Sequence, residues 1–152
     1  MKKFRFRLDT LLDIRKRKED EIKLRLAEKN RQYIEAQRKV NSIHDQLKEL
    51  QNSEKERRGS NESIMMLRHS VSYRFKLKED LLQAGKKVDE IRGEIARVRK
   101  TLVTATRDRR AIELVKERRL AEWKKEYRTE EQSFIDDVSQ QGFIRKVQSQ
   151  KG

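Results

Sequence analysis

The chain has 152 residues and a net charge of +14, with 43% charged residues, 34% hydrophobic residues, no proline and no cysteine. This apolar content is too low for an ordinary globular core, and the lack of cysteine excludes disulfides and thiolate metal sites. Disorder or long helices that bury one narrow seam remain, and the absence of proline favours helices.

The first twelve residues contain an unusual cluster of apolar side chains. Phe4, Phe6 and Leu8 alternate with charged residues as in a strand, and from Leu8 the spacing becomes helical. The cluster is too short and too charged for a signal peptide, and no apolar run approaches the roughly 20 residues of a membrane span. We therefore expect a soluble, cytoplasmic protein.

A heptad ladder runs from Leu8 to Leu50. By a ladder we mean a set of positions spaced alternately four and three residues apart, as along a coiled-coil seam. Ten of the thirteen positions of this ladder are apolar. The polar exceptions are Arg15, Glu19 and Lys29, a type of seam residue that costs stability but fixes register. This pattern predicts a first helix over about residues 5–57.

The pattern stops in the stretch SEKERRGSNES, residues 53–63, which has no apolar side chain. Gly59 is a candidate helix stop, and Ser60 and Asn61 are candidate N-caps for a following helix. The sequence therefore predicts a turn over about residues 58–62.

A second ladder runs from Leu77 to Trp123, with eleven apolar residues in fourteen positions. It predicts a second helix over about residues 62–139, with Gly142 as a possible stop and a loose tail over residues 140–152.

The two ladders stay in phase about the predicted turn, pairing Ile22 with Val98 and Leu50 with Val71. The expected fold is all-α: a single antiparallel two-helix coiled-coil hairpin over residues 1–152, with an overshooting C-terminal helix. In the overshoot, Trp123, Tyr127 and Phe134 are expected to find no partner in the chain.

Positive charge is concentrated in two segments. Residues 1–18 hold eight Lys/Arg against two Asp, and residues 97–128 hold twelve Lys/Arg against five acidic residues. The hairpin would bring both segments to one end. A basic nucleic-acid-binding rod is one alternative function, but interspersed acidic residues and the internal turn argue against it, and we expect no nucleic-acid partner.

The chain contains no signature of a catalytic or metal site. Phosphate-binding loops, nucleophile elbows and HExxH motifs are absent from the sequence, and the predicted register separates His44 from His69. Most carboxylates have a Lys or Arg three or four residues away, as on an exposed helix. We expect no enzymatic activity, no cofactor, no metal and no small-molecule ligand.

The two ends of the sequence resemble a known family. The start, Phe4-x-Phe6-x-Leu8-x-x-Leu11-Leu12-x-x-Arg15-x-x-x-Glu19, resembles the N-terminus of the flagellar FliJ family. Residues 111–139, with the pair Asp136-Asp137, are similar to its C-terminal region.

The resemblance implies a small antiparallel coiled coil of the flagellar type III export apparatus, similar to the central stalk of rotary ATPases. Its implied partners are the hexameric export ATPase, whose ring it enters with both chain ends, and the cytoplasmic part of the export gate membrane protein. Some members also handle late export chaperones. The implied location is the inner face of the cell membrane at the flagellar base.

The resemblance and the charge pattern together give two sets of candidate contact residues. Phe4, Phe6, Leu8 and Leu11 are expected to form a patch for the ring, or a plug against Ile112 and Leu114. The full ring set is Phe4, Phe6, Leu8, Leu11, Arg15, Arg109, Arg110, Leu114, Arg118, Arg119 and Leu120. The gate set is Tyr73, Phe75, Leu77, Leu81 and Ala84.

Within the gate set, Leu77, Leu81 and Ala84 are also seam positions, so Tyr73 and Phe75 are the better surface candidates. A structural adaptor that dimerises through its unpaired C-terminal helix is a further alternative function.

Overall fold

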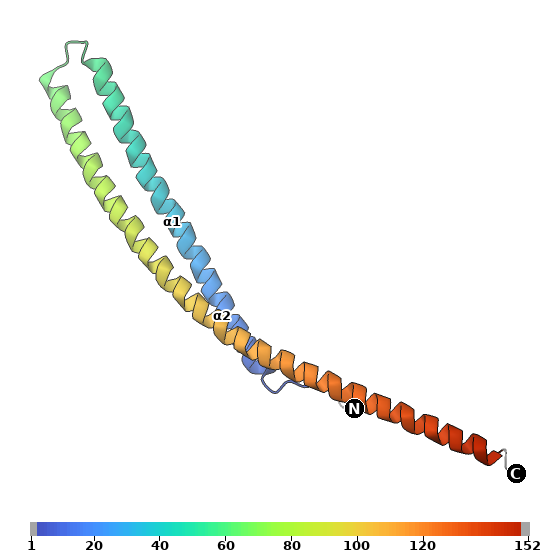
Figure 1. Cartoon of the computed structure of the whole chain (residues 1–152). Coiled ribbons are helices and arrows are strands. Elements are labelled where there is room, and N and C mark those ends of the chain that lie inside the picture. The colour runs from blue at the N-terminus through green and yellow to red at the C-terminus, as the bar shows by residue number, and fades with distance from the viewer. Residues whose placement is uncertain (1–2, 150–152) are drawn as a thin grey trace. The chain divides into compact units, whose positions relative to one another are not determined.

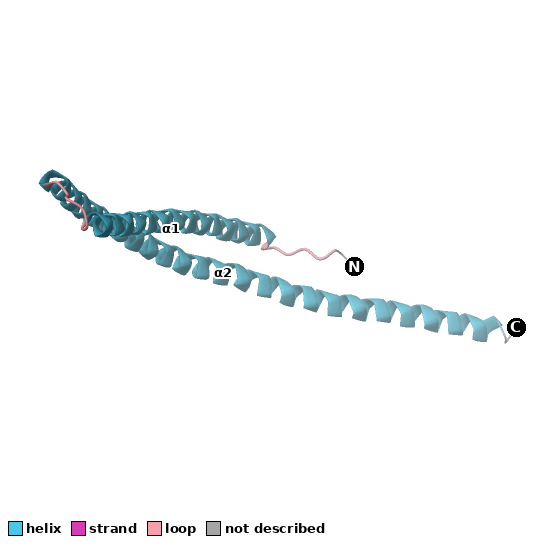
Figure 2. Cartoon of the chain, turned by 90° about the horizontal axis from the view of Figure 1, so that it is seen from above, coloured by secondary structure: helices cyan, strands magenta, loops and turns pink. Residues whose placement is uncertain are grey.

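The computed structural model describes residues 3–149, apart from the side chains of Val147 and Ser149. These residues form two helices, α1 (Asp9–Arg57) and α2 (Ile64–Ser149), and no strand (Figures 1 and 2). The expected helical hairpin, with two long helices packed against each other, is confirmed.

The chain divides into two compact units, each with parts of both helices. We call residues 19–104 the hairpin unit, and residues 1–18 together with residues 105–152 the end unit. In the hairpin unit, α1 and α2 run antiparallel from the connecting turn (Figure 1).

The buried apolar residues all come from the two ladders. They are Leu12, Ile22, Ile43, Leu77, Ala84, Val88, Ile91, Ile95 and Ala105. In the hairpin unit, Val40, Leu47, Leu50 and Leu81 pack against the cluster of Ile43, Leu77 and Ala84. Heptad phase therefore decides which side chains leave water, although no side chain here is enclosed as in a globular core.

One predicted seam contact is wrong. Ser70 is buried near the turn, whereas Val71, expected to face Leu50, is exposed. Ser70 precedes Leu77 by one heptad, so it is the backward extension of the second ladder. Although Val71 is apolar, it does not occupy the seam, because the nine buried apolar residues fix the register of the two helices.

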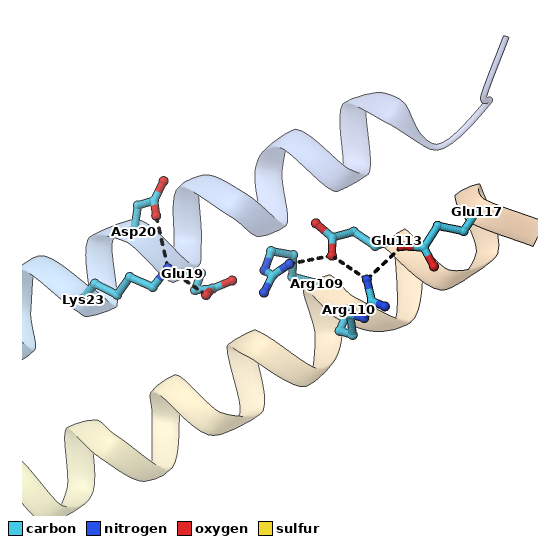
Figure 3. Close-up of polar contacts among 7 residues, drawn as sticks. All are labelled: Glu19, Asp20, Lys23, Arg109, Arg110, Glu113 and Glu117. Atoms are coloured by element: carbon cyan, nitrogen blue, oxygen red, sulfur yellow. Dashed lines mark hydrogen bonds and ion pairs between the residues drawn. The ribbon is translucent and has the colours of Figure 1, made fainter. Parts of the chain in front are cut away.

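Two polar seam residues of α1 are satisfied by ion pairs inside the hairpin unit. Glu19 is buried, and the Nζ atom of Lys23 lies 2.9 Å from its carboxylate (Figure 3). Lys29 pairs with Glu94 of α2. Such pairs let charged groups occupy a seam without leaving a buried charge unpaired.

The turn differs from the expected one in its caps. α1 ends at Arg57, and α2 begins at Ile64 after Ser63, whose Oγ accepts a hydrogen bond from the Met66 amide at 3.3 Å. Ser63 is therefore the N-cap, in place of Ser60 or Asn61. Gly59 has no positive φ, so it does not act as a left-handed helix stop.

Both outer helix boundaries also differ from the prediction. α1 begins at Asp9 instead of about residue 5, because residues 3–8 are held as a non-helical segment in the end unit. α2 continues through Gly142 to Ser149, so residues 140–149 are not a loose tail. A single glycine costs a helix only about 1 kcal/mol, and no proline follows to end it. Residues 150–152 lie outside the described residues.

The antiparallel register can be tested by cross-linking. Replacing Leu26 and Ile95, two facing ladder positions of the hairpin unit, with cysteine should give an intramolecular disulfide on oxidation. Non-reducing electrophoresis and mass spectrometry would detect it. Exclusively intermolecular cross-links would contradict the hairpin.

Burial also predicts how two neighbouring residues of α2 respond to truncation. Leu77 is only 3% exposed, so Leu77→Ala should lower the free energy of unfolding by about 2–4 kcal/mol. Phe75 is 74% exposed, so Phe75→Ala should change it by less than about 0.5 kcal/mol. Urea denaturation would measure both, and equal losses would contradict the assignment of faces.

Candidate functional site

The N-terminal segment of the end unit packs along α2 through its first aromatic residue. The ring centroid of Phe4 lies 6.0 Å from that of Trp123, and Trp123 in turn stacks on Tyr127 at 5.4 Å. Trp123 therefore does contact the N-terminal segment, contrary to the expectation that it has no partner. The prediction failed because it followed helix pairing alone, and Phe4 precedes α1.

A second contact fixes the segment where it enters α1. The Nζ atom of Lys116 lies 5.8 Å from the centre of the Phe6 ring and 2.6 Å from Oδ1 of Asp9, the first residue of α1. One ammonium group thus makes both a cation–π contact and an ion pair. The contacts of Phe4 and Phe6 lie further along α2 than the expected Ile112 and Leu114.

An open groove runs between the segment and α2, and both aromatic and charged side chains line it. Its walls are residues 3–8 and, from α2, Val115, Arg119, Glu122, Trp123 and Glu126. Phe4 and Phe6 are half-buried, so each keeps part of its ring accessible. The groove therefore offers aromatic surface beside guanidinium groups, a combination enriched at protein interfaces.

Several basic residues of the end unit are engaged by carboxylates. Arg15 donates a hydrogen bond to Asp108 at 2.9 Å. Along α2, Arg109 reaches Glu113 at 2.6 Å, and Arg110 bridges Glu113 and Glu117 (Figure 3). Three of the acidic residues that interrupt the basic segments, Asp108, Glu113 and Glu117, are thus partners of arginines.

These contacts shift the ionisation of the groups involved. The hydrogen bond from Arg109 holds the pKa of Glu113 below its ordinary value, with a smaller contribution from Arg110. The hydrogen bond to Glu117, followed by that to Glu113, raises the pKa of Arg110. Both directions favour the charged forms, so Arg110 and Glu113 are both ionised at neutral pH.

The remaining ring candidates differ in how accessible they are. Arg118 is exposed and forms no ion pair with any described residue, whereas Arg119 pairs with Glu122 at 3.6 Å. Leu8, Leu11 and Leu114 are exposed, and Leu120 is half-buried. The end unit therefore brings together unpaired charge and exposed apolar surface.

The gate candidates divide between two faces of α2 in the hairpin unit. Tyr73 and Phe75 are exposed, whereas Leu77 and Ala84 are buried and Leu81 packs against them. Among these residues, only Tyr73 and Phe75 can meet a partner without opening the hairpin.

Sequence reasoning missed a third ladder, on the outward face of α2. It consists of Ile64, Arg68, Val71, Phe75, Lys78 and Leu82, and we call it the outer ladder. Its four apolar members are all exposed. Its spacing of four and three was visible in the sequence, but walking the heptads only from Leu77 passed over it.

The described residues hold neither a metal centre nor a membrane span. No group of three or more histidine or acidic side chains among them could hold an ion. No helix in the described part is long and apolar enough to cross a bilayer.

The ionisation of Glu113 provides a test of the ion-pair chain. Its carboxyl should titrate with a midpoint below 4.5, the ordinary value for glutamate, because Arg109 stabilises the charged form. Arg109→Gln should move the midpoint up towards 4.5. A carboxyl-detected NMR titration measures both, and a midpoint that is unchanged by Arg109→Gln would contradict the pairing.

Comparison with known proteins gives one match. A sequence model of the family described as "Flagellar FliJ protein" matches residues 4–148. Among curated proteins and among solved structures, no match was found. Since the matched region covers nearly the whole chain, the chain belongs to the flagellar FliJ protein family and is a component of flagellar protein export.

Proposed function

We propose that the chain is a non-enzymatic stalk that links the hexameric flagellar export ATPase to the cytoplasmic part of the export gate membrane protein. The end unit would contact the ATPase ring, and the hairpin unit would contact the gate. The observation that carries this proposal is the family match over residues 4–148. The chain would act on the cytoplasmic side of the flagellar base and associate with the membrane through the gate.

The surface of the end unit supports the ring contact. Leu8, Leu11 and Leu114 are exposed apolar residues of this unit, although Leu8 lies at the start of the first ladder. Arg5, Arg7 and Arg118 form no ion pair with any residue that the structure describes. Unpaired cations around an apolar patch favour an acidic partner surface, which they would attract before contact.

The hairpin unit supports the gate contact through Tyr73 and Phe75. Both are aromatic, and both are exposed on α2. Leu77, Leu81 and Ala84 would act by keeping this face of α2 straight and in register. Handling of export chaperones is a prediction from the family resemblance, and no feature of the described residues favours it.

Nucleic-acid binding is the weaker alternative. Arg15, Arg109 and Arg110 are held by carboxylates, which reduces the number of cations that could meet phosphates. Dimerisation is a separate possibility that does not exclude a stalk.

The ring contact can be tested with Leu11→Ser combined with Leu114→Ser. Because both side chains are already exposed, the melting temperature should stay nearly unchanged, while affinity for the purified export ATPase should fall at least about tenfold. Surface plasmon resonance would measure the affinity. For the unmodified chain, the rate of association with the ATPase should fall as the salt concentration rises, because salt screens the attraction between exposed charges.

A matched control lies on α1 of the hairpin unit. Leu24→Ser with Ile34→Ser also removes two exposed apolar side chains, but should leave ATPase binding unchanged. Equal losses in both double variants, or no loss in either, would contradict a ring contact at the end unit.

A further inference from the structure

Helix α2 exposes a second apolar ladder beyond residue 123. From Lys124 to Lys146 its side chains are exposed on every face. One line on this stretch alternates steps of four and three: Tyr127, Glu131, Phe134, Val138, Gln141 and Arg145, which we call the C-terminal stripe. Phe134 is 68% exposed, close to the 74% of Phe75 on the outer ladder.

The two exposed ladders have the same spacing and complementary contents. The outer ladder reads apolar, cation, apolar, apolar, cation, apolar. The C-terminal stripe reads apolar, acid, apolar, apolar, amide, cation. Laid side by side as a coiled-coil seam, the two ladders match in their four central layers.

The match holds in both directions, because the outer ladder is symmetric about its centre. In a parallel pair Glu131 meets Arg68, and in an antiparallel pair it meets Lys78. The central layers are then Val71 and Phe75 against Phe134 and Val138 in either case. Neither Arg68 nor Lys78, nor Glu131, forms an ion pair within the described part of the chain, so the pairing would satisfy groups that lack a charged partner.

Pairing of like ladders is less favourable. Two outer ladders would place Arg68 against Arg68 or Lys78 of the other copy, which is repulsive in a seam. Two C-terminal stripes would place Glu131 against Glu131 or Gln141, without any ion pair. Charge complementarity therefore selects the unlike pair.

We propose that the C-terminal stripe of one molecule docks on the outer ladder of a second copy. Both ladders belong to α2, and an unbroken helix cannot pack against itself, so the pairing requires two molecules. The interface is heterologous: each molecule offers one ladder of each kind, and head-to-tail growth follows. Occupation of the outer ladder would also cover Phe75. This inference goes beyond the stalk function and does not depend on it.

Complementation between two variants tests the arrangement. The unmodified chain should show self-association that increases with concentration up to about 1 mM in sedimentation velocity. Phe75→Ser, which damages only the outer ladder, and Phe134→Ser, which damages only the stripe, should each weaken it at least about tenfold. Mixed in equal amounts, the two variants should form a heterodimer that grows no further, because one intact ladder of each kind remains.

Two further variants distinguish specific docking from nonspecific hydrophobic association. Phe143→Ser removes an exposed aromatic residue of the same stretch that lies off the stripe, and should leave self-association unchanged. Glu131→Lys should weaken association, and adding Arg68→Glu with Lys78→Glu should restore it. Circular dichroism would confirm that every variant keeps its helices.

The remaining outcomes overturn the proposal. The proposal is wrong if the unmodified chain stays monomeric over the whole concentration range. That conclusion holds whether or not the chain binds the gate, the ATPase or lipid vesicles. If only one of the two serine variants loses association and mixing gives no heterodimer, like ladders pair instead. Failure of the charge exchange would remove the basis for choosing the unlike pair.

Discussion

The seam between α1 and α2 is the interaction on which the rest of the structure depends. It is narrow, because each helix contributes only one side chain every three or four residues. No residue of this seam is enclosed on all sides, so stability comes from the number of layers that stay in phase. This explains why the chain accepts charged seam residues such as Glu19 and Lys29, provided that Lys23 and Glu94 lie within reach.

The sequence was sufficient to predict the hairpin because heptad phase is a local property that sums over many residues. The nine buried apolar residues all lie on the two predicted ladders. The predictions of the helix cap and of the partner of Trp123 failed, because each of these features depends on a single contact and not on heptad phase. Ser63 caps α2 through one hydroxyl group, and the ring of Phe4 finds Trp123 although Phe4 is outside any helix. Neither contact has a periodic signal.

The candidate sites were less predictable than the fold for a related reason. Composition identified a basic end, but it could not tell which arginines are already engaged. The structure separates Arg109 and Arg110, whose carboxylate partners lie one or two turns away, from Arg118, which forms no ion pair with a described residue. In the gate set, Leu77 and Phe75 are two positions apart and lie on different faces of α2, so a family resemblance alone could not separate packing from surface.

The contact between Phe4 and Trp123 makes tryptophan fluorescence a probe of the end unit. Trp123 is the one tryptophan of the chain, so all tryptophan emission of the protein originates beside the N-terminal segment. Its indole lines the groove and is neither fully buried nor fully exposed. Emission wavelength and quenching therefore read out, without any label, whether the segment is docked or a partner has displaced it. Events in the hairpin unit would leave the tryptophan emission unchanged unless they reached this one ring.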